Sequence, residues 1–185
     1  MNQEKLYVFG GSFDPFHIGH EAIVSAVLKE YGQVLIIPTQ NPWKPVGLLS
    51  LNKRIEILKE FYKDQKGAEV SDLCLQDPEF NYMYKVVEHY SHKKIVFVMG
   101  EDSYKSFPQW KNYDEIKDIV DVIVFKRNRD GLAVPNAPRV RVLPMSLYQN
   151  EISSTVCRQN LKKNKHLIPL KIFELMEKAI NEEKA

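Results

Sequence analysis

The stretch LYVFGGSFDPFHIGHEAIVSAVLKEY, residues 6–31, decides the fold. It begins with a short apolar run at 6–9, turns through Gly10 and Gly11, and continues into an amphipathic segment at 18–31. Apolar residues spaced for one face of a helix, directly after a short apolar strand, indicate the first half of a strand–helix–strand unit. The stretch therefore predicts an α/β protein.

The same alternation continues along the chain. Further apolar runs rich in Val, Ile and Phe occur at 34–37, 95–99, 120–125 and 140–143. Compositions and spacings compatible with helices occur at 51–62, 82–92 and 114–118. Continuous apolar runs suit strands that are covered on both faces. We expect a Rossmann-like, doubly wound, mainly parallel sheet with helices on both faces.

A C-terminal helical segment is expected after the last strand, with helices near 155–163 and 170–183. The first would be capped by Ser153 or Ser154, and the second would begin with Pro169 at its first helical position. No repeat, low-complexity segment or long linker divides the chain. The sequence thus predicts one domain over 1–185, with a core at 5–150 and C-terminal helices at 151–185.

The composition excludes several classes of protein. A formal net charge of +2, with one dense basic run at 162–165, is too small to indicate bulk binding of nucleic acid. Cys74 and Cys157 stand far apart, without a Cys-x-x-Cys or Cys/His cluster, so neither a disulfide framework nor a zinc site is indicated. Neither a membrane span nor a signal-peptide pattern is present, so a cytoplasmic location is expected.

The turn after the first strand has the features of a phosphate site. Gly10 and Gly11 let a phosphate approach the backbone, and the N-terminus of the following helix favours anions. His17 and His20 are three residues apart across that helix start, so both rings can face one phosphorus centre, and Gly19 leaves room for a ligand. Alternatively, they are ordinary residues of a helix start, or a metal pair that lacks further ligands.

The string Gly10–His20 resembles the Gly-[Thr/Ser]-Phe-Asp-Pro-x-His-x-Gly-His signature of the HxGH nucleotidyltransferases. Gly100–Trp110 and Ile152–Arg158 resemble two later motifs of the bacterial nicotinate-mononucleotide adenylyltransferases within that superfamily. The resemblance extends from Tyr7 to about Leu161. Pantetheine-phosphate adenylyltransferases are similar in the first motif and in a serine-rich late motif, but not in the Asp102–Trp110 segment.

The resemblance implies roles for the residues at matching positions. The catalytic residues would be His17, His20, Lys44 and Arg158, with the two histidines stabilising the transferring α-phosphate. Contacts with ATP would come from Gly10, Gly11, Ser12, Phe13, Gly19, Gly100, Asp102, Ser153, Ser154 and Thr155. The helix start at 153–155 and Arg158 would form a phosphate clamp. Contacts with the pyridine nucleotide would come from Ser12, Tyr82, Met83, Trp110 and Lys111, with the Trp110 ring stacking on the pyridine.

Two departures from the family pattern leave the choice of pyridine base open. In the loop Gln40–Pro45, Trp43 stands where a histidine is usual, although Lys44 is retained. Met83 replaces a threonine that the family associates with the pyridine carboxylate. A thioether cannot donate a strong hydrogen bond, so backbone N–H groups near Trp110 and Lys111 would have to supply that contact.

The expected reaction is transfer of AMP from ATP to nicotinate mononucleotide, which forms nicotinate adenine dinucleotide and pyrophosphate. Mg²⁺ is the expected cofactor, held by ATP and water, with no protein ligand assigned. Three alternatives stay open: a different acceptor, namely nicotinamide mononucleotide or phosphopantetheine; a nucleotide-binding sensor without turnover; and a structural metal module built from His17, His20 and His89 or His92. The sequence does not determine the oligomeric state.

Overall fold

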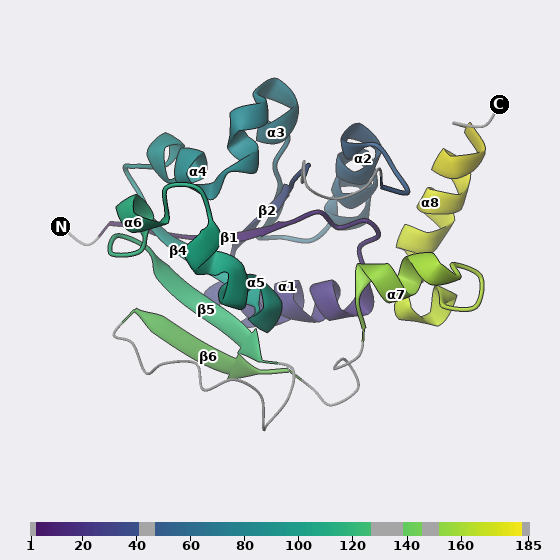
Figure 1. Ribbon diagram of the computed structural model, residues 1–185. Coiled ribbons are helices and arrows are strands. Elements are labelled where there is room, and N and C mark those ends of the chain that lie inside the picture. The colour runs from purple at the N-terminus through teal and green to yellow at the C-terminus, as the bar shows by residue number, and fades with distance from the viewer. Residues whose placement is uncertain (1–2, 41–46, 127–138, 146–151, 183–185) are drawn as a thin grey trace.

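A single six-stranded sheet organises the chain in the computed structural model, which describes residues 3–40, 47–126, 139–145 and 152–182 (Figure 1). The strand order is β3-β2-β1-β4-β5-β6, and every pairing between neighbours is parallel. The strands are β1 (Lys5–Gly11), β2 (Val34–Pro38), β3 (Ala68–Val70), β4 (Lys94–Gly100), β5 (Asp121–Lys126) and β6 (Val140–Pro144). The expected doubly wound α/β architecture is confirmed.

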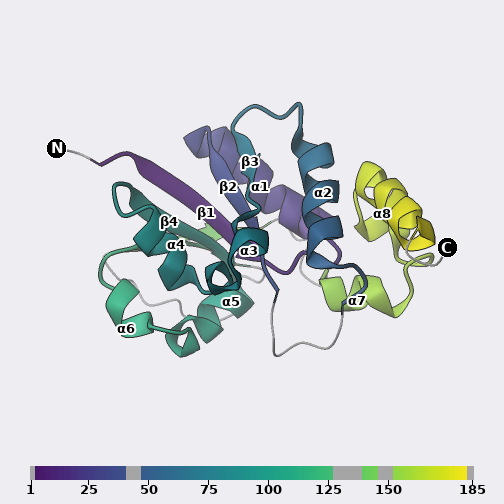
Figure 2. The ribbon, with the colours of Figure 1, turned by 90° about the horizontal axis from the view of Figure 1, so that it is seen from above.

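Helices connect the strands and cover both faces of the sheet. They are α1 (Ile18–Tyr31), α2 (Leu51–Tyr62), α3 (Leu73–Gln76), α4 (Met83–His89), α5 (Glu101–Ser106), α6 (Tyr113–Ile116), α7 (Ser154–Gln159) and α8 (Leu170–Glu182). Figure 2 shows α4, α5 and α6 on one side of β1, with α1, α2 and α8 on the other. Helix α8 packs against α2, so the C-terminal segment is part of the same body.

Two apolar clusters fill the space between the sheet and these helices. Successive side chains of a strand point to opposite faces, so β1 contributes Phe9 to one cluster and Val8 to the other. The Phe9 cluster includes buried residues of α1, α2, α7 and α8. The Val8 cluster includes buried residues of α3, α4 and α6. Strands buried on both faces explain the continuous apolar runs in the sequence.

Helix α1 has the bounds expected from the sequence because both of its ends carry strong signals. His17 is the N-cap, and its ring accepts a hydrogen bond from the backbone N–H of His20. Gly32 ends the helix at φ 79°, a left-handed conformation that glycine adopts without strain. The N–H of Gly32 then donates to the carbonyl of Leu28.

Several expected bounds differ from the structure. The helices expected at 82–92, 114–118 and 155–163 are shorter, at Met83–His89, Tyr113–Ile116 and Ser154–Gln159. Helix α8 begins at Leu170, one residue after Pro169, whose carbonyl accepts a hydrogen bond from Phe173. The expectation that Pro169 would be the first helical residue is therefore wrong. Strand β3 and the short helices α3 and α5 were not expected, because segments of three to six residues show too little periodicity.

Both cysteines, Cys74 and Cys157, are buried free thiols. Burial raises the pKa of the Cys74 thiol to about 11. Across 3–40, 47–126, 139–145 and 152–182, no helix has the length and apolar character that crossing a membrane requires.

Candidate active site at the carboxyl edge of the sheet

The glycine-rich turn after β1 lies where the strand order reverses. Strand β1 is flanked by β2 and β4, and the chain winds outward from it in both directions. Ligands of open α/β sheets bind at this switch point, beyond the carboxyl ends of the strands. Gly10 and Gly11 end β1 there, beside Ile37 and Pro38 at the end of β2. Gly100 ends the neighbouring strand β4.

The turn after β1 is shaped by two phenylalanines. Phe13 has φ 48°, a left-handed conformation that is uncommon for a residue with a side chain. Its ring is buried and packs edge-on against Phe9, with centroids 5.2 Å apart. A Cβ atom on Gly11 would lie 2.9 Å from the Phe13 ring. Glycine at position 11 therefore leaves the space that the Phe13 ring occupies.

The His17 and His20 rings lie face to face at the start of α1. Their centroids are 3.6 Å apart and their planes differ by 18°. His17 is buried, and His20 is half-buried against the rings of Phe13 and Phe16. The expectation that both imidazoles face the same side of the helix start is confirmed.

Reciprocal hydrogen bonds to the backbone fix the orientation of both rings. The N–H of His20 donates to Nδ1 of His17, and the N–H of His17 donates to Nδ1 of His20, each at 3.3 Å. This arrangement is a capping box with two histidines in place of the usual Ser/Thr and Glu. A neutral imidazole that accepts at Nδ1 carries its proton on Nε2. Each ring can therefore present an Nε2–H donor, as stabilisation of phosphate oxygens requires.

Gly19 makes room for this pair. Its Cα is buried, and an added Cβ atom would lie 3.1 Å from both Cε1 and Nδ1 of the His17 ring. That separation is tighter than ordinary van der Waals contact. The ring of His17 holds its position because position 19 has no side chain.

Helix α7 packs against the turn after β1. Ser153 is the N-cap of α7, and its Oγ accepts from the N–H of Val156. The Oγ of Ser154 donates to the carbonyl of Pro15 at 2.9 Å. The guanidinium of Arg158 donates to the carbonyl of Asp14 and to Oγ1 of Thr155. The expected clamp residues are thus joined to the histidine turn, across more than 130 residues of sequence.

A second group of expected residues lies around the start of α4. Met83 is buried, and its Sδ is 3.3 Å from the position of a Cβ added to Gly10. The ammonium of Lys111 lies 4.3 Å from the centre of the Tyr82 ring. Trp110 packs edge-on against Phe107, with centroids 5.1 Å apart. Of these residues expected to bind the pyridine nucleotide, Met83 lies against the glycine turn.

The remaining expected residues are Lys44, Asp102 and Gly100. Lys44, like its neighbour Trp43, lies outside the described residues. Asp102 is exposed in the first turn of α5. A Cβ atom on Gly100 would meet nothing within 4 Å, so the surrounding protein does not itself require glycine there.

Asp14 and Arg54, to which the sequence analysis gave no role, are buried charged residues beside the turn. The carboxylate of Asp14 accepts hydrogen bonds from the N–H groups of Leu48 and Leu49, at 2.8 and 3.2 Å. Arg54 is buried on α2 and donates to the carbonyl oxygens of Leu49 and Thr39. Asp14 stands within the motif. Arg54 stands three residues after Leu51 and four before Leu58, on the apolar face of the helix, and this spacing is the signal that could have found it.

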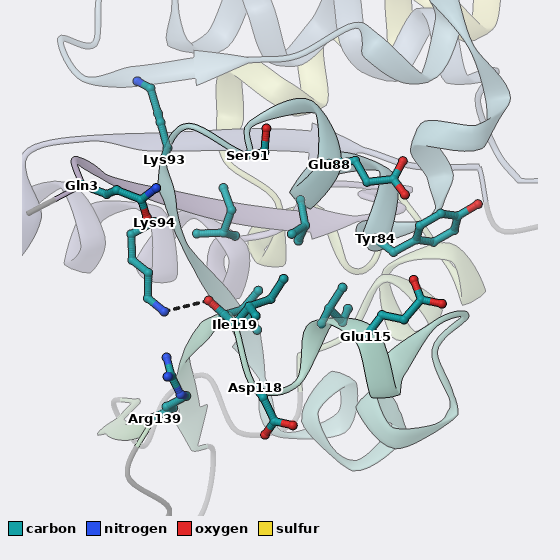
Figure 3. A pocket seen from close by; sticks show the side chains of 14 residues that line it. Gln3, Tyr84, Glu88, Ser91, Lys93, Lys94, Glu115, Asp118, Ile119 and Arg139 are labelled. Carbon is teal, nitrogen blue, oxygen red and sulfur yellow. Dashed lines mark hydrogen bonds between the residues drawn. The ribbon is translucent and has the colours of Figure 1, made fainter.

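A hollow of about 480 Å³ lies elsewhere, at the edge where the strands begin (Figure 3). Lys93, Lys94 and Arg139 line one side of it, and Glu88 and Glu115 the other. These cations already have partners: Lys93 pairs with Glu4, and Lys94 and Arg139 pair with Asp121. The hollow contains none of the expected site residues.

Comparison with known proteins places the chain. A family model described as cytidylyltransferase-like matches residues 8–160. A protein of Sulfurimonas denitrificans named probable nicotinate-nucleotide adenylyltransferase is 35% identical, over 88% of this chain and 88% of its own length. A protein of Fusobacterium nucleatum with the same name is 34% identical, over 94% of this chain and 97% of its own length.

Solved structures share the fold. The nicotinic acid mononucleotide adenylyltransferase of Plasmodium falciparum, complexed with NaAD, superposes with a TM-score of 0.76. It is 16% identical, and the match covers 95% of each chain. A putative nicotinate-nucleotide adenylyltransferase from Vibrio parahaemolyticus superposes with a TM-score of 0.64 at 22% identity, over 94% of this chain and 98% of its own.

Proposed function

This chain belongs to the cytidylyltransferase-like family, and from that premise we propose that it transfers AMP from ATP to nicotinate mononucleotide. The products are nicotinate adenine dinucleotide and pyrophosphate, a step in the synthesis of NAD. The curated relatives from Sulfurimonas and Fusobacterium are named for this activity, and the match with this chain covers most of their length. The nearly complete overlap supports the same activity for the whole chain.

The observation that carries the proposal is the stacked pair of His17 and His20. The pair lies at a helix N-terminus beside the glycine turn of β1, at the switch point of the sheet. Two Nε2–H donors and a helix N-terminus provide hydrogen bonds and positive potential for a phosphate. Arg158, whose guanidinium is bonded to the same turn, adds a positive charge next to them.

The proposed reaction is a direct displacement at the α-phosphorus of ATP. An oxygen of the acceptor's 5′-phosphate attacks the α-phosphorus of ATP, and the bond from that phosphorus to the bridging α–β oxygen breaks. Pyrophosphate leaves with the bonding electrons, so no covalent intermediate on the protein is needed. His17 and His20 stabilise charge on the α-phosphate oxygens, and Ser154 and Arg158 hold the outgoing phosphates.

Mg²⁺ is proposed as the cofactor, bound to the triphosphate and to water, where it offsets negative charge. Among the residues that the structure describes, no group of three or more His, Cys, Asp or Glu side chains could hold a metal ion. The carboxylate of Asp14, the acidic group within the turn, is engaged by two backbone N–H groups.

The acceptor's pyridine ring is proposed to bind beside Tyr82, Met83, Trp110 and Lys111. The half-buried indole of Trp110 offers a flat face, and the ammonium of Lys111 lies 4.3 Å from the centre of the Tyr82 ring. We expect Trp110→Ala to raise KM for the pyridine nucleotide about tenfold or more and to leave KM for ATP within about threefold. An equal loss for both substrates, with a lower Tm, would assign Trp110 to the core formed with Phe107.

Labelled ATP tests the proposed reaction directly. With nicotinate mononucleotide and Mg²⁺, label on the α-phosphate should appear in the dinucleotide and label on the γ-phosphate in pyrophosphate. Label from the α-phosphate that remains with free AMP would identify a hydrolase instead. Binding of ATP without any product would favour a nucleotide sensor.

Nicotinamide mononucleotide is the alternative acceptor that a specific observation favours. The thioether of Met83 is buried against Gly10, and it cannot donate a hydrogen bond to a carboxylate. A neutral carboxamide needs no such donor. Lys111 would favour the acid by exchanging its present partner, the Glu79 carboxylate 3.5 Å away, for the carboxylate of the pyridine.

A further inference from the structure

We propose that Arg54 is a positioning residue for this reaction: its guanidinium ties the turn after β1 to the segments before and after the 41–46 loop. The inference rests on the proposed function, because it concerns the same histidine turn. Arg54 does not belong to the expected site residues, and it acts through the backbone that they share.

The contacts of Arg54 reach three separate segments. Its Nη1 donates to the carbonyl of Ser12 and, at 2.9 Å, to the carbonyl of Thr39. Nη2 donates to Oε1 of Gln40 at 2.6 Å, and Nε donates to the carbonyl of Leu49 at 3.2 Å. One rigid, planar group therefore joins the end of β2, the turn after β1 and the start of α2.

This arrangement uses a property that only arginine has. A guanidinium carries five N–H donors in fixed directions, whereas a lysine ammonium is a single point on a flexible stem. Arg54 is 5% exposed, and its charge is lodged among carbonyl oxygens. Desolvation lowers the pKa of Arg54, and the nearby Asp14 carboxylate opposes that shift. A buried charge is retained only where hydrogen bonds compensate its desolvation.

Asp14 forms a second link between the same turn and the segment before α2. Its carboxylate accepts from the N–H groups of Leu48 and Leu49, while its own carbonyl accepts from Arg158. The turn is thus linked to the segment before α2 by two buried charged groups, Asp14 and Arg54, and to α7 by the exposed Arg158. His17 follows Asp14 by three residues, so a displaced turn would displace the first histidine.

The consequence for catalysis is geometric. A shift of about 1 Å in a group that stabilises the transition state can lower the rate about 10²-fold, even when the mutated residue does not touch substrate. Arg54→Lys retains the charge but cannot reach all four acceptors in the same directions. We expect kcat to fall about tenfold or more, with KM for both substrates within about threefold of wild type.

The experiment compares Arg54→Lys, Gln40→Ala and a control, Lys59→Met. Lys59 lies on the same helix but is exposed and pairs with Asp72 at the surface. Gln40→Ala removes the acceptor of Nη2 while leaving Arg54 in place, so it tests the link even if Arg54→Lys fails to fold. Rates are measured well below each Tm and normalised to folded protein. Hydrogen exchange is followed at the amides of Thr39, Leu48 and Leu49, which bond across the linked segments.

We expect kcat to fall most in Arg54→Lys and less in Gln40→Ala. In both variants the amides of Thr39, Leu48 and Leu49 should exchange faster than in wild type. Lys59→Met should match wild type in kcat and in exchange. Wild-type kcat and wild-type exchange in folded Arg54→Lys, or in Gln40→Ala if Arg54→Lys does not fold, would overturn the inference. If the wild-type protein forms no dinucleotide, the proposed function fails. Amide exchange still tests the link in that case: faster exchange in the variants supports it, and unchanged exchange overturns it.

Discussion

At the scale of single residues, the chemistry depends on how His17 and His20 are held. Each ring caps the backbone of the other, so the same hydrogen bonds that begin α1 also set the tautomer of both imidazoles. Helix start and phosphate site are therefore one structure. A sequence with histidine at both positions achieves what Ser/Thr and Glu achieve in an ordinary capping box, and adds two donors.

Replacing His20 by alanine removes one of the two donors proposed to stabilise the α-phosphate. We expect His20→Ala to lower kcat about 10²-fold while ATP binding stays within a few-fold, as is typical for a group that acts in the transition state. Steady-state rates and calorimetric titration with ATP measure the two quantities. His166→Ala, at an exposed histidine that bonds to Lys163 in a distant turn, is the control. Full turnover in His20→Ala would refute the role of the pair.

Gly19→Ala tests the room that the His17 ring needs. The added methyl group would lie 3.1 Å from the ring and would push it by a few tenths of an ångström. We expect kcat to fall several-fold, up to about tenfold, because small displacements of catalytic groups are costly. Stability should hold or rise, since alanine is favoured over glycine in a helix by about 1 kcal/mol.

The control for Gly19→Ala is Ser25→Ala, at an exposed position of the same helix. Kinetics and thermal unfolding of both variants separate the two effects. Unchanged kcat in Gly19→Ala would mean that the ring tolerates the shift, and the steric argument would be wrong.

Residues with a local signal could be predicted, and residues whose role depends on long-range contacts could not. The pair His17 and His20 follows from spacing at a helix start. Arg54 and Asp14 bond to segments far along the chain, and nothing in their neighbourhood reveals those partners. The packing of Met83 on Gly10 likewise joins residues of different strand–helix units.

At the scale of elements, the sequence predicted the bounds of the long helices that have a capping residue and an apolar face. Helices α1 and α2 have the expected bounds, with His17 and Ser50 as their N-caps. Strand β3 is short and has an exposed Glu69 at its centre, so no apolar run marks it. Helix α5 starts directly from β4 and lasts only two turns, too few for a period to show.

The cap of α7 offers a prediction at this scale. Ser153→Ala removes the hydrogen bond to the N–H of Val156, and loss of such a cap costs about 1 kcal/mol. For a protein of this size, we expect Tm to fall by about 2–4 °C. KM for ATP should also rise, because the N-terminus of α7 is proposed to hold its phosphates.

Thermal scans and ATP titration check the prediction for Ser153→Ala, with Ser25→Ala as reference. An unchanged Tm together with an unchanged KM would show that this helix start is neither capped by Ser153 nor part of the phosphate clamp.

At the scale of the whole molecule, the site exists because of the order in which the strands are assembled. The chain winds outward from β1 in both directions, so the ends of β1, β2 and β4 meet at one edge. That edge gathers the glycine turn, the start of α4 and the start of α7, which are far apart in the sequence. Alternation of strands and helices predicted this arrangement, whereas contacts between distant segments, such as Arg54 with Ser12, have no signal in the sequence.

The central claim is that this site adenylates nicotinate mononucleotide. The most direct measurement is pyrophosphate release from Mg-ATP, with nicotinate mononucleotide, nicotinamide mononucleotide and phosphopantetheine compared by kcat/KM. We expect a strong preference for nicotinate mononucleotide, about 10²-fold or more, as a charged contact with the carboxylate would provide. Preference for either of the other two acceptors, or no turnover with any of them, would contradict it.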